Sequence, residues 1–261
     1  MMHPLGQTRT SVHRDHAVIA PDSHVISPIH GYDHVDGVML ISPAMASSGG
    51  GNATRGPGFA MFVANFTSRS AIGPRDRPVQ RLIYVLDGSV TVDGNDLGAD
   101  SFAYLGCQST AKLSCNDAAR ALIFEKPYIA VGDTSPPGDR YGRWTQGDGE
   151  SFMGDDGARL SKLLPETSEF DMAVNVFTFD PGTPLPLVET HIMEHGLYMS
   201  RGAGVYRLAD RWYPVAAGDA IWMAAYCPQW FVAMGKTPAQ YIYYKDIHRD
   251  HLPPSGSDHE N

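Results

Sequence analysis

The sequence predicts an all-β fold made of two tandem β-barrels, and three observations support this prediction. Short segments rich in Val, Ile, Tyr and Phe recur between turns, because 27 glycines and 19 prolines interrupt the 261 residues. No long segment keeps the 3.6-residue apolar period of an amphipathic helix. The pattern of the first half also recurs in the second half, which indicates an internal duplication.

Seven segments have the composition of β-strands, with β-branched and aromatic residues between turn residues. Turns such as Asp93-Gly94 and Ala217-Gly218-Asp219 separate them at the spacing of a sandwich or barrel. The expected strands are 59–66, 81–92, 121–125, 172–179, 197–208, 220–224 and 241–245.

The repeat is clearest around two glycines. Residues 84–90 and 198–205 both have the pattern of strand, glycine turn and strand, with the turns at Gly88 and Gly202. Gly, Pro and Asp accumulate between the two halves, which predicts a linker there. The predicted division is an N-terminal barrel with an N-terminal arm over residues 1–130, a linker over 131–159, a C-terminal barrel over 160–249 and a mobile tail over 250–261.

Composition and charge exclude several classes of function. Twenty basic against 29 acidic residues give a net charge of −9, and no Lys/Arg-rich run could follow phosphates, so nucleic acid is not an expected partner. The longest apolar run, 220–227, ends at Pro228, far short of the roughly 20 residues of a membrane span. Residues 1–20 show no signal-peptide pattern, and three cysteines form no spaced framework. We therefore expect a cytoplasmic protein without a membrane partner.

Residues with metal-binding chemistry are concentrated in the second half, since no histidine lies between His34 and His191. On an extended strand Glu189 and His191 point to the same face, and His195 shares that face if the strand continues without a bulge. A carboxylate and two imidazoles inside a barrel suit Mn, Fe, Ni, Cu or Zn rather than Ca. The alternative is two ordinary histidines at a strand edge, but the flanking glycines and the repeated barrel pattern favour a metal site.

The resemblance to a known superfamily becomes specific at these residues. Gly182, Glu189, His191, His195 and Gly202 resemble the first motif of the cupins, whose barrels are double-stranded β-helices, or jelly rolls. The second cupin motif resembles residues 218–229, and Gln229 stands where a histidine is usual. Together with 207–215, 221–224, 228–230 and 243–246, this order resembles the (S)-ureidoglycine aminohydrolases, which are bicupins of purine breakdown.

The resemblance implies a metal-dependent hydrolysis of (S)-ureidoglycine, a small molecule, to (S)-ureidoglycolate and ammonia. The implied ion is Mn²⁺, or another divalent transition metal, bound by Glu189, His191, His195 and Gln229. Bicupins commonly self-associate through strand edges and an N-terminal arm, so a homo-oligomer is also expected.

Three further residues are candidates for holding the substrate or moving protons: Tyr206, Tyr241 and Lys245. Tyr241 and Lys245 are four apart in the last expected strand and therefore share a face. Lys245 could pair with the substrate carboxylate or carry a proton. The alternatives are ordinary barrel packing for the tyrosines and a solvated strand end for the lysine.

The first half lacks this donor set. Its positions equivalent to Glu189, His191 and His195 are Arg75, Arg77 and Arg81, and the equivalent of Gln229 falls near Thr110. Three cations would repel a metal ion, so no metal site is expected in the N-terminal barrel. An irregular histidine cluster in the N-terminal arm is interpreted as solvated or capping side chains: His13, His16, His24, His30 and His34.

Two other functions stay open, because the fold hosts many reactions. One is a metal-dependent cupin oxygenase or isomerase that acts on another small acid. The other is a non-catalytic bicupin whose metal only anchors a ligand. Release of ammonia without oxygen uptake would exclude the oxygenase, and binding without turnover would identify the non-catalytic protein.

Overall fold

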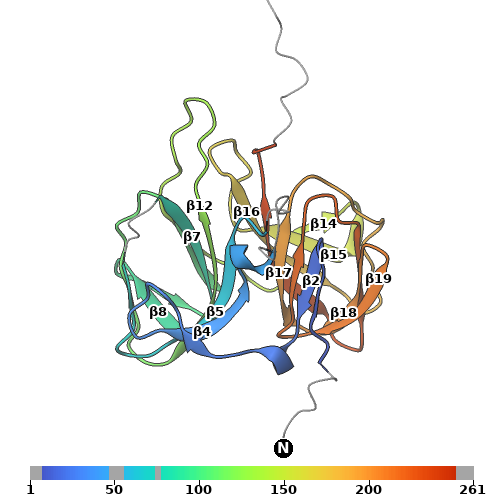
Figure 1. Cartoon of the computed structure of the whole chain (residues 1–261), viewed down its shortest axis with the longest axis horizontal. Helices are drawn as coiled ribbons and strands as arrows, with labels where there is room; N and C mark the ends of the chain where they lie inside the picture. The colour runs from blue at the N-terminus through green and yellow to red at the C-terminus, as the bar shows by residue number, and fades with distance from the viewer. Residues whose placement is uncertain (1–7, 47–55, 74–77, 251–261) are drawn as a thin grey trace, which may run out of the picture.

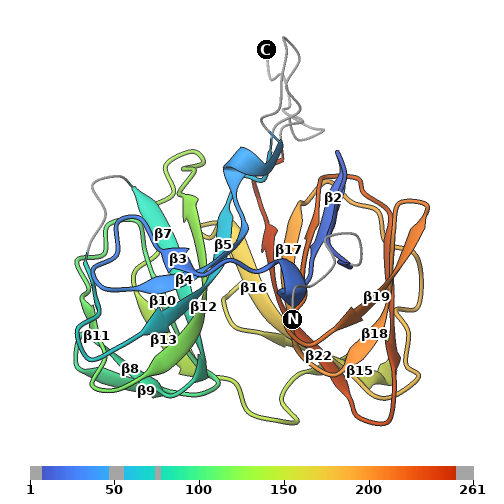
Figure 2. The ribbon, with the colours of Figure 1, turned by 60° about the horizontal axis from the view of Figure 1, so that its bottom comes forward.

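Residues 8–46, 56–73 and 78–250 are described by the computed structural model and form two β-barrels side by side (Figure 1). These residues contain 22 strands and two short 3-10 helices, η1 (Pro21–Ser23) and η2 (Pro43–Ala46). Figure 2 shows that most of the first half of the chain builds one barrel and the second half the other. The predicted all-β fold is confirmed. Over the same residues, no helix is long and apolar enough to cross a membrane.

The first barrel combines a seven-stranded and a four-stranded sheet. Its strands are β3 (Ser27–Pro28), β4 (Asp36–Ile41), β5 (Ala60–Phe66), β6 (Ala71–Ile72), β7 (Val79–Asp87), β8 (Ser89–Val92), β9 (Asn95–Gly98), β10 (Ser101–Leu105), β11 (Leu113–Ser114), β12 (Ala119–Pro127) and β13 (Arg140–Arg143). The large sheet has the order β13-β10-β7-β12-β5-β4-β3, and the small sheet the order β6-β11-β8-β9. Two antiparallel sheets around one apolar interior are the arrangement of a jelly roll.

The second barrel combines an eight-stranded and a three-stranded sheet. Its strands are β1 (Ser11–Val12), β2 (His16–Ile19), β14 (Glu150–Phe152), β15 (Asp155–Lys162), β16 (Met172–Phe179), β17 (His195–Arg201), β18 (Ala203–Leu208), β19 (Arg211–Ala216), β20 (Ala220–Met223), β21 (Gln229–Met234) and β22 (Ala239–Asp246). The large sheet has the order β1-β2-β20-β17-β22-β16-β15-β14, and the small sheet the order β19-β18-β21.

The central strands of both large sheets are buried on both faces, because one face lines a barrel and the other packs between the barrels. In β7, Tyr84 lies in the apolar cluster that both halves share, whereas Ile83 lies in the interior of the first barrel. In β22, Tyr244 lies in the shared cluster and Tyr243 in the interior of the second barrel. The two barrels therefore share a core of their own in addition to the two barrel interiors.

Two equivalent glycines reflect the internal repeat. Gly88 joins β7 to β8 with φ of +72°, and Gly202 joins β17 to β18 with φ of +69°. A Cβ at Gly88 would lie 2.4 Å from the carbonyl oxygen of Ala118, and a Cβ at Gly202 would lie 2.5 Å from that of Pro238. Both positions therefore require glycine, for the positive φ and for the close approach of the neighbouring strand.

The structure differs from the predicted division of the chain in two places. β2 of the N-terminal arm pairs with β20, which adds the arm to the large sheet of the second barrel. Within the expected linker, β13 pairs with β10 of the first barrel, and β14 and most of β15 belong to the second barrel. These pairings are between distant segments, so local composition does not reveal them. The expectations for Arg75, for Arg77, for residues 1–7 of the arm and for residues 251–261 of the tail lie outside the described residues.

A buried ion pair joins the two barrels. The carboxylate of Asp171, just before β16, lies 3.0 Å from the Nζ of Lys126 in β12. The same carboxylate accepts hydrogen bonds from the side chain of Gln80 and from the backbone N–H of Ile129. Asp171 is fully buried and Lys126 is 5% exposed, so each charge depends on these partners.

Candidate metal centre

A cavity of about 130 Å³ lies inside the second barrel. Its lining comes from strands of both sheets of that barrel and from the segment before β17. All seven residues that the sequence singled out line it: Glu189, His191, His195, Tyr206, Gln229, Tyr241 and Lys245. Residues more than 50 positions apart in the sequence thus meet in one small cavity.

The segment that holds Glu189 and His191 is not a continuous strand. Glu189 forms an isolated antiparallel bridge with Gln229, with reciprocal backbone hydrogen bonds of 2.8 and 2.9 Å. The carbonyl of His191 accepts a 2.7 Å hydrogen bond from the backbone N–H of Tyr226. His195 begins β17. Strand alternation therefore does not explain why these side chains share the cavity; the bridge and the turn before β17 bring them together.

The two imidazoles face each other. The rings of His191 and His195 are 4.5 Å apart between centroids. The Nδ1 of His191 lies 3.2 Å from the carbonyl oxygen of Met193, so a proton donated there leaves a lone pair on Nε2. Among the described residues, the buried Nδ1 of His195 has no hydrogen-bond partner. Burial lowers the pKa of both imidazoles, which keeps them in the neutral form that binds metals.

The amide of Gln229 connects the imidazoles to Tyr206. Its Nε2 is 3.1 Å from the Nε2 of His191, and its Oε1 accepts a 3.2 Å hydrogen bond from the Tyr206 hydroxyl. Rotation of the amide by half a turn exchanges its oxygen and nitrogen, since the two ends have the same shape. An oxygen can therefore take the position beside His191.

The last strand, β22, contributes three side chains to the cavity at alternate positions: Tyr241, Tyr243 and Lys245. Sequence reasoning missed Tyr243, although the same period-two alternation that grouped Tyr241 with Lys245 includes it. The Tyr243 hydroxyl accepts a 3.0 Å hydrogen bond from the buried Nδ2 of Asn175, and its ring stacks on His195 at 5.7 Å. Burial raises the pKa of the Tyr241 and Tyr243 hydroxyls, so both stay neutral donors.

Glu189 and Lys245 are the charged groups of opposite sign in the lining. Burial raises the pKa of the Glu189 carboxyl, and the nearby Lys245 ammonium partly offsets this effect. The Lys245 side chain is 20% exposed and also contacts Glu166 outside the cavity, at 3.4 Å. The cavity lining thus offers one anionic donor and one cation.

The donor set fits a divalent transition metal in its chemistry. One carboxylate, two neutral imidazoles and one amide oxygen are ligands that such ions accept, and an orphaned buried imidazole nitrogen is an atom that a metal would satisfy. The donor atoms of Glu189, His191 and His195 do not all lie within 4.8 Å of one another. Side-chain rotations would therefore accompany the binding of an ion.

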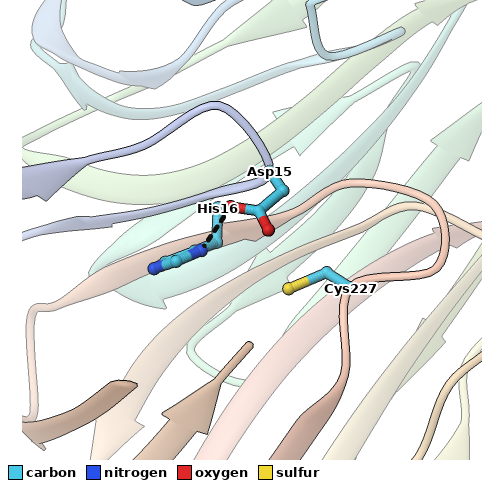
Figure 3. A group of neighbouring side chains, drawn as sticks. All are labelled: Asp15, His16 and Cys227. Atoms are coloured by element: carbon cyan, nitrogen blue, oxygen red, sulfur yellow. Dashed lines mark hydrogen bonds and ion pairs between the residues drawn. The ribbon is translucent and has the colours of Figure 1, made fainter. Parts of the chain in front are cut away.

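A second group of ligand-type side chains lies at the N-terminal arm (Figure 3). Asp15, His16 and Cys227 are the one such group in the described part of the chain whose donor atoms all lie within 4.8 Å of one another. Both ring nitrogens of His16 already have protein partners, Asp15 and the hydroxyl of Tyr213, each at 2.8 Å. Burial and the charge of Asp15 raise the pKa of the Cys227 thiol to about 11. We therefore interpret these contacts as fixing β2 to the second barrel, and not as a metal-binding site.

Comparison with known proteins places the chain in a family. Residues 175–244, which include His191, His195 and Gln229, match the cupin domain family. An (S)-ureidoglycine aminohydrolase from Arabidopsis thaliana is 36% identical over 261 aligned positions, which cover 95% of this chain and 80% of that protein. The chain belongs to the (S)-ureidoglycine aminohydrolase family. A bacterial (S)-ureidoglycine aminohydrolase, from Escherichia coli K12, is 27% identical over 91% of this chain and 90% of its own length.

Solved structures share the two-barrel fold of this chain. A crystal structure of the protein Ylba from E. coli superposes with a TM-score of 0.77 at 25% identity, over 95% of this chain and 97% of that one. An oxalate decarboxylase superposes with a TM-score of 0.64 at 10% identity over 92% of this chain and 79% of that one, and shares the fold alone. The bicupin architecture therefore extends beyond the aminohydrolase family.

Proposed function

We propose that this chain hydrolyses (S)-ureidoglycine to (S)-ureidoglycolate and ammonia in the cavity of its second barrel. Family membership supports the reaction, and the meeting of all seven candidate residues in one cavity of about 130 Å³ supports the place. In this reaction the bond from Cα to the amine breaks, a bond from Cα to a water oxygen forms, and a water proton passes to the departing nitrogen. No oxidant or second substrate is needed.

The proposed ion is Mn²⁺, held by Glu189, His191, His195 and Gln229. These four side chains would hold the ion from the protein side, and substrate or water would complete its ligands. When bound, the ion would supply Lewis-acid polarisation and lower the pKa of a bound water. Because Gln229 is neutral, Glu189 is the one ligand that offsets the charge of the ion.

The other polar side chains would orient the substrate. Lys245 is the cation of the lining and fits the substrate carboxylate. The hydroxyls of Tyr206 and Tyr241 stay protonated because burial raises their pKa, so they fit as donors to the ureido oxygen. The apolar walls exclude bulk water from the reacting atoms, with Phe177 and Leu197 among them.

The test measures ammonia release from freshly generated (S)-ureidoglycine. We expect release above the spontaneous rate for manganese-loaded protein, and loss of that release after chelation or in Glu189→Ala. The matched control is Glu169→Ala, which removes a carboxylate that does not line the cavity. Release at the spontaneous rate by the loaded wild type would exclude the proposed reaction, and oxygen uptake would point to an oxygenase.

Self-association is part of the same proposal. β1 and β14 end the eight-stranded sheet, and strand edges of this kind can pair with a second copy. We expect a homo-oligomer, and size-exclusion chromatography with light scattering would measure its mass. A monomer at micromolar concentration would contradict this part without affecting the catalytic part.

A further inference from the structure

Glu166 lies outside the cavity and contacts a residue inside it. It belongs to the loop between β15 and β16, and its Oε1 is 3.4 Å from the Nζ of Lys245 in β22. Its second oxygen, Oε2, is 2.6 Å from the Nζ of Lys162, the last residue of β15. The carboxylate therefore bridges two ammonium groups, one on the cavity wall and one at the surface.

The bridge is partly shielded from water. The Lys245 side chain is 20% exposed and that of Glu166 is 30% exposed, whereas Lys162 is 49% exposed. An ion pair in this environment is screened less than one at the open surface, so it can fix a long side chain. Lys162 contacts one oxygen of the carboxylate from the surface side, and the other oxygen contacts Lys245.

Lys245 also lies close to a second carboxylate. Its charge acts on Glu189 across the cavity, and the two residues line the same small space. A lysine has four rotatable bonds, so without an outer partner its ammonium could turn inward to Glu189. That contact would neutralise the one anionic metal ligand and would occupy the cation that the substrate carboxylate needs.

We propose that Glu166 is a positioning residue that holds the Lys245 ammonium at the cavity wall and away from Glu189. The proposal rests on the proposed function, because it assigns Glu166 to the binding of a substrate carboxylate. Glu166 does not line the cavity, so it acts through Lys245 alone. It would make this site selective for substrates that carry a carboxylate.

A double-mutant cycle tests this dependence. We expect Glu166→Gln to raise the KM for (S)-ureidoglycine about threefold to tenfold, with a smaller change in kcat. In a Lys245→Met background the same substitution should change KM less than about twofold, because the group it acts through is gone. Equal effects in both backgrounds would overturn the proposal while leaving the reaction established.

The matched control is Lys162→Met, which removes a cation from the other oxygen of Glu166 and leaves the Lys245 contact in place. We expect a change in KM below about twofold. A rise in KM as large as that of Glu166→Gln would overturn the proposal. It would show that any change of charge at Lys162 or Glu166 affects KM, whether or not the contact with Lys245 is kept.

A crystal structure of Glu166→Gln gives a readout that does not depend on turnover. We expect the Lys245 Nζ to move toward the Glu189 carboxylate. An unchanged Lys245 side chain would overturn the positioning role even if the chain proved inactive toward ureidoglycine. Failure of the reaction and failure of the positioning role are therefore distinguishable.

Discussion

Gln229 is the amide among the proposed ligands, neutral like the two imidazoles and unlike the carboxylate of Glu189. A neutral ligand withdraws less of the positive charge of an ion than a carboxylate does, so the ion stays more electrophilic. The Tyr206 hydroxyl contacts this amide and, because a hydroxyl both donates and accepts, it can pair with either end of Gln229. One uncharged side chain thus links the strength of metal binding to the reactivity of the site.

Gln229→Glu tests this link. A second carboxylate should tighten Mn²⁺ binding by about tenfold or more, equivalent to about 1.4 kcal/mol, and should lower kcat by a similar factor. Electron paramagnetic resonance of free Mn²⁺ measures the first effect and ammonia release the second. Tighter binding with an unchanged kcat would show that the charge of the ion does not limit the reaction.

At the residue scale, the sequence predicted which types of side chain line the cavity, but it did not predict the contacts that bring them together. The motif identified Glu189 and His191 by type, and the cavity includes both. It could not foresee that Glu189 pairs with Gln229 through a backbone bridge, since that contact joins segments 40 positions apart. The alternation of side chains along the last strand could have identified Tyr243. It could not identify the hydrogen-bond partner Asn175, because that residue lies on another strand.

Among the elements, the N-terminal arm has the most distant partner. Arg9 donates hydrogen bonds to both oxygens of the fully buried Asp219, at 2.5 and 2.8 Å, in the turn before β20. His16 of β2 is 2% exposed and bonds Tyr213 of β19. Local periodicity predicts strands such as 172–179, which the structure reproduces as β16, but it contains no information about which strands pair.

His16 makes the docking of the arm dependent on pH. Burial lowers the pKa of His16 from its usual 6.5, although the hydrogen bond and charge of Asp15 oppose this effect. As pH falls below 6.5, the unfolded chain binds a proton at His16 while the folded chain still excludes it. The free energy of unfolding should therefore decrease with falling pH, by at most about 1.4 kcal/mol per pH unit from this group.

The variant His16→Gln isolates the contribution of this side chain. We expect the difference in unfolding free energy between wild type and variant to shrink as pH is lowered from about 7 to about 5, because only the wild type has this group. Urea titrations at each pH measure the difference. His30→Gln, at an exposed position, is the control, and a difference that stays constant with pH would contradict the assignment.

At the scale of the whole molecule, the two barrels depend on each other. Their large sheets pack through a shared apolar cluster, and the Asp171–Lys126 pair lies buried beside it. Barrel interiors of about twenty residues each add to this shared core, so we expect the chain to unfold in one cooperative transition. The internal repeat predicted two tandem barrels. Neither the motifs nor the composition predicted how the two barrels pack against each other.

Lys126→Met tests the dependence between the barrels. It leaves the buried carboxylate of Asp171 without its cation, so the free energy of unfolding should fall by about 3–5 kcal/mol. Chemical denaturation followed by fluorescence measures the loss. Lys112→Met, at an exposed position, is the control and should change stability by less than about 0.5 kcal/mol. Equal stability of the two variants would show that Gln80 and the Ile129 N–H suffice for Asp171.

The docking of the arm also sets an order of events during synthesis. β2 is made early, but its partner β20 follows about 200 residues later. At the usual rate of translation, roughly 5–20 residues per second, β20 follows β2 after about 10–40 seconds. During that interval the arm has no sheet to join, and the second barrel cannot close its large sheet. The arm, which is made before the first barrel, is thus among the last segments to pair with its sheet.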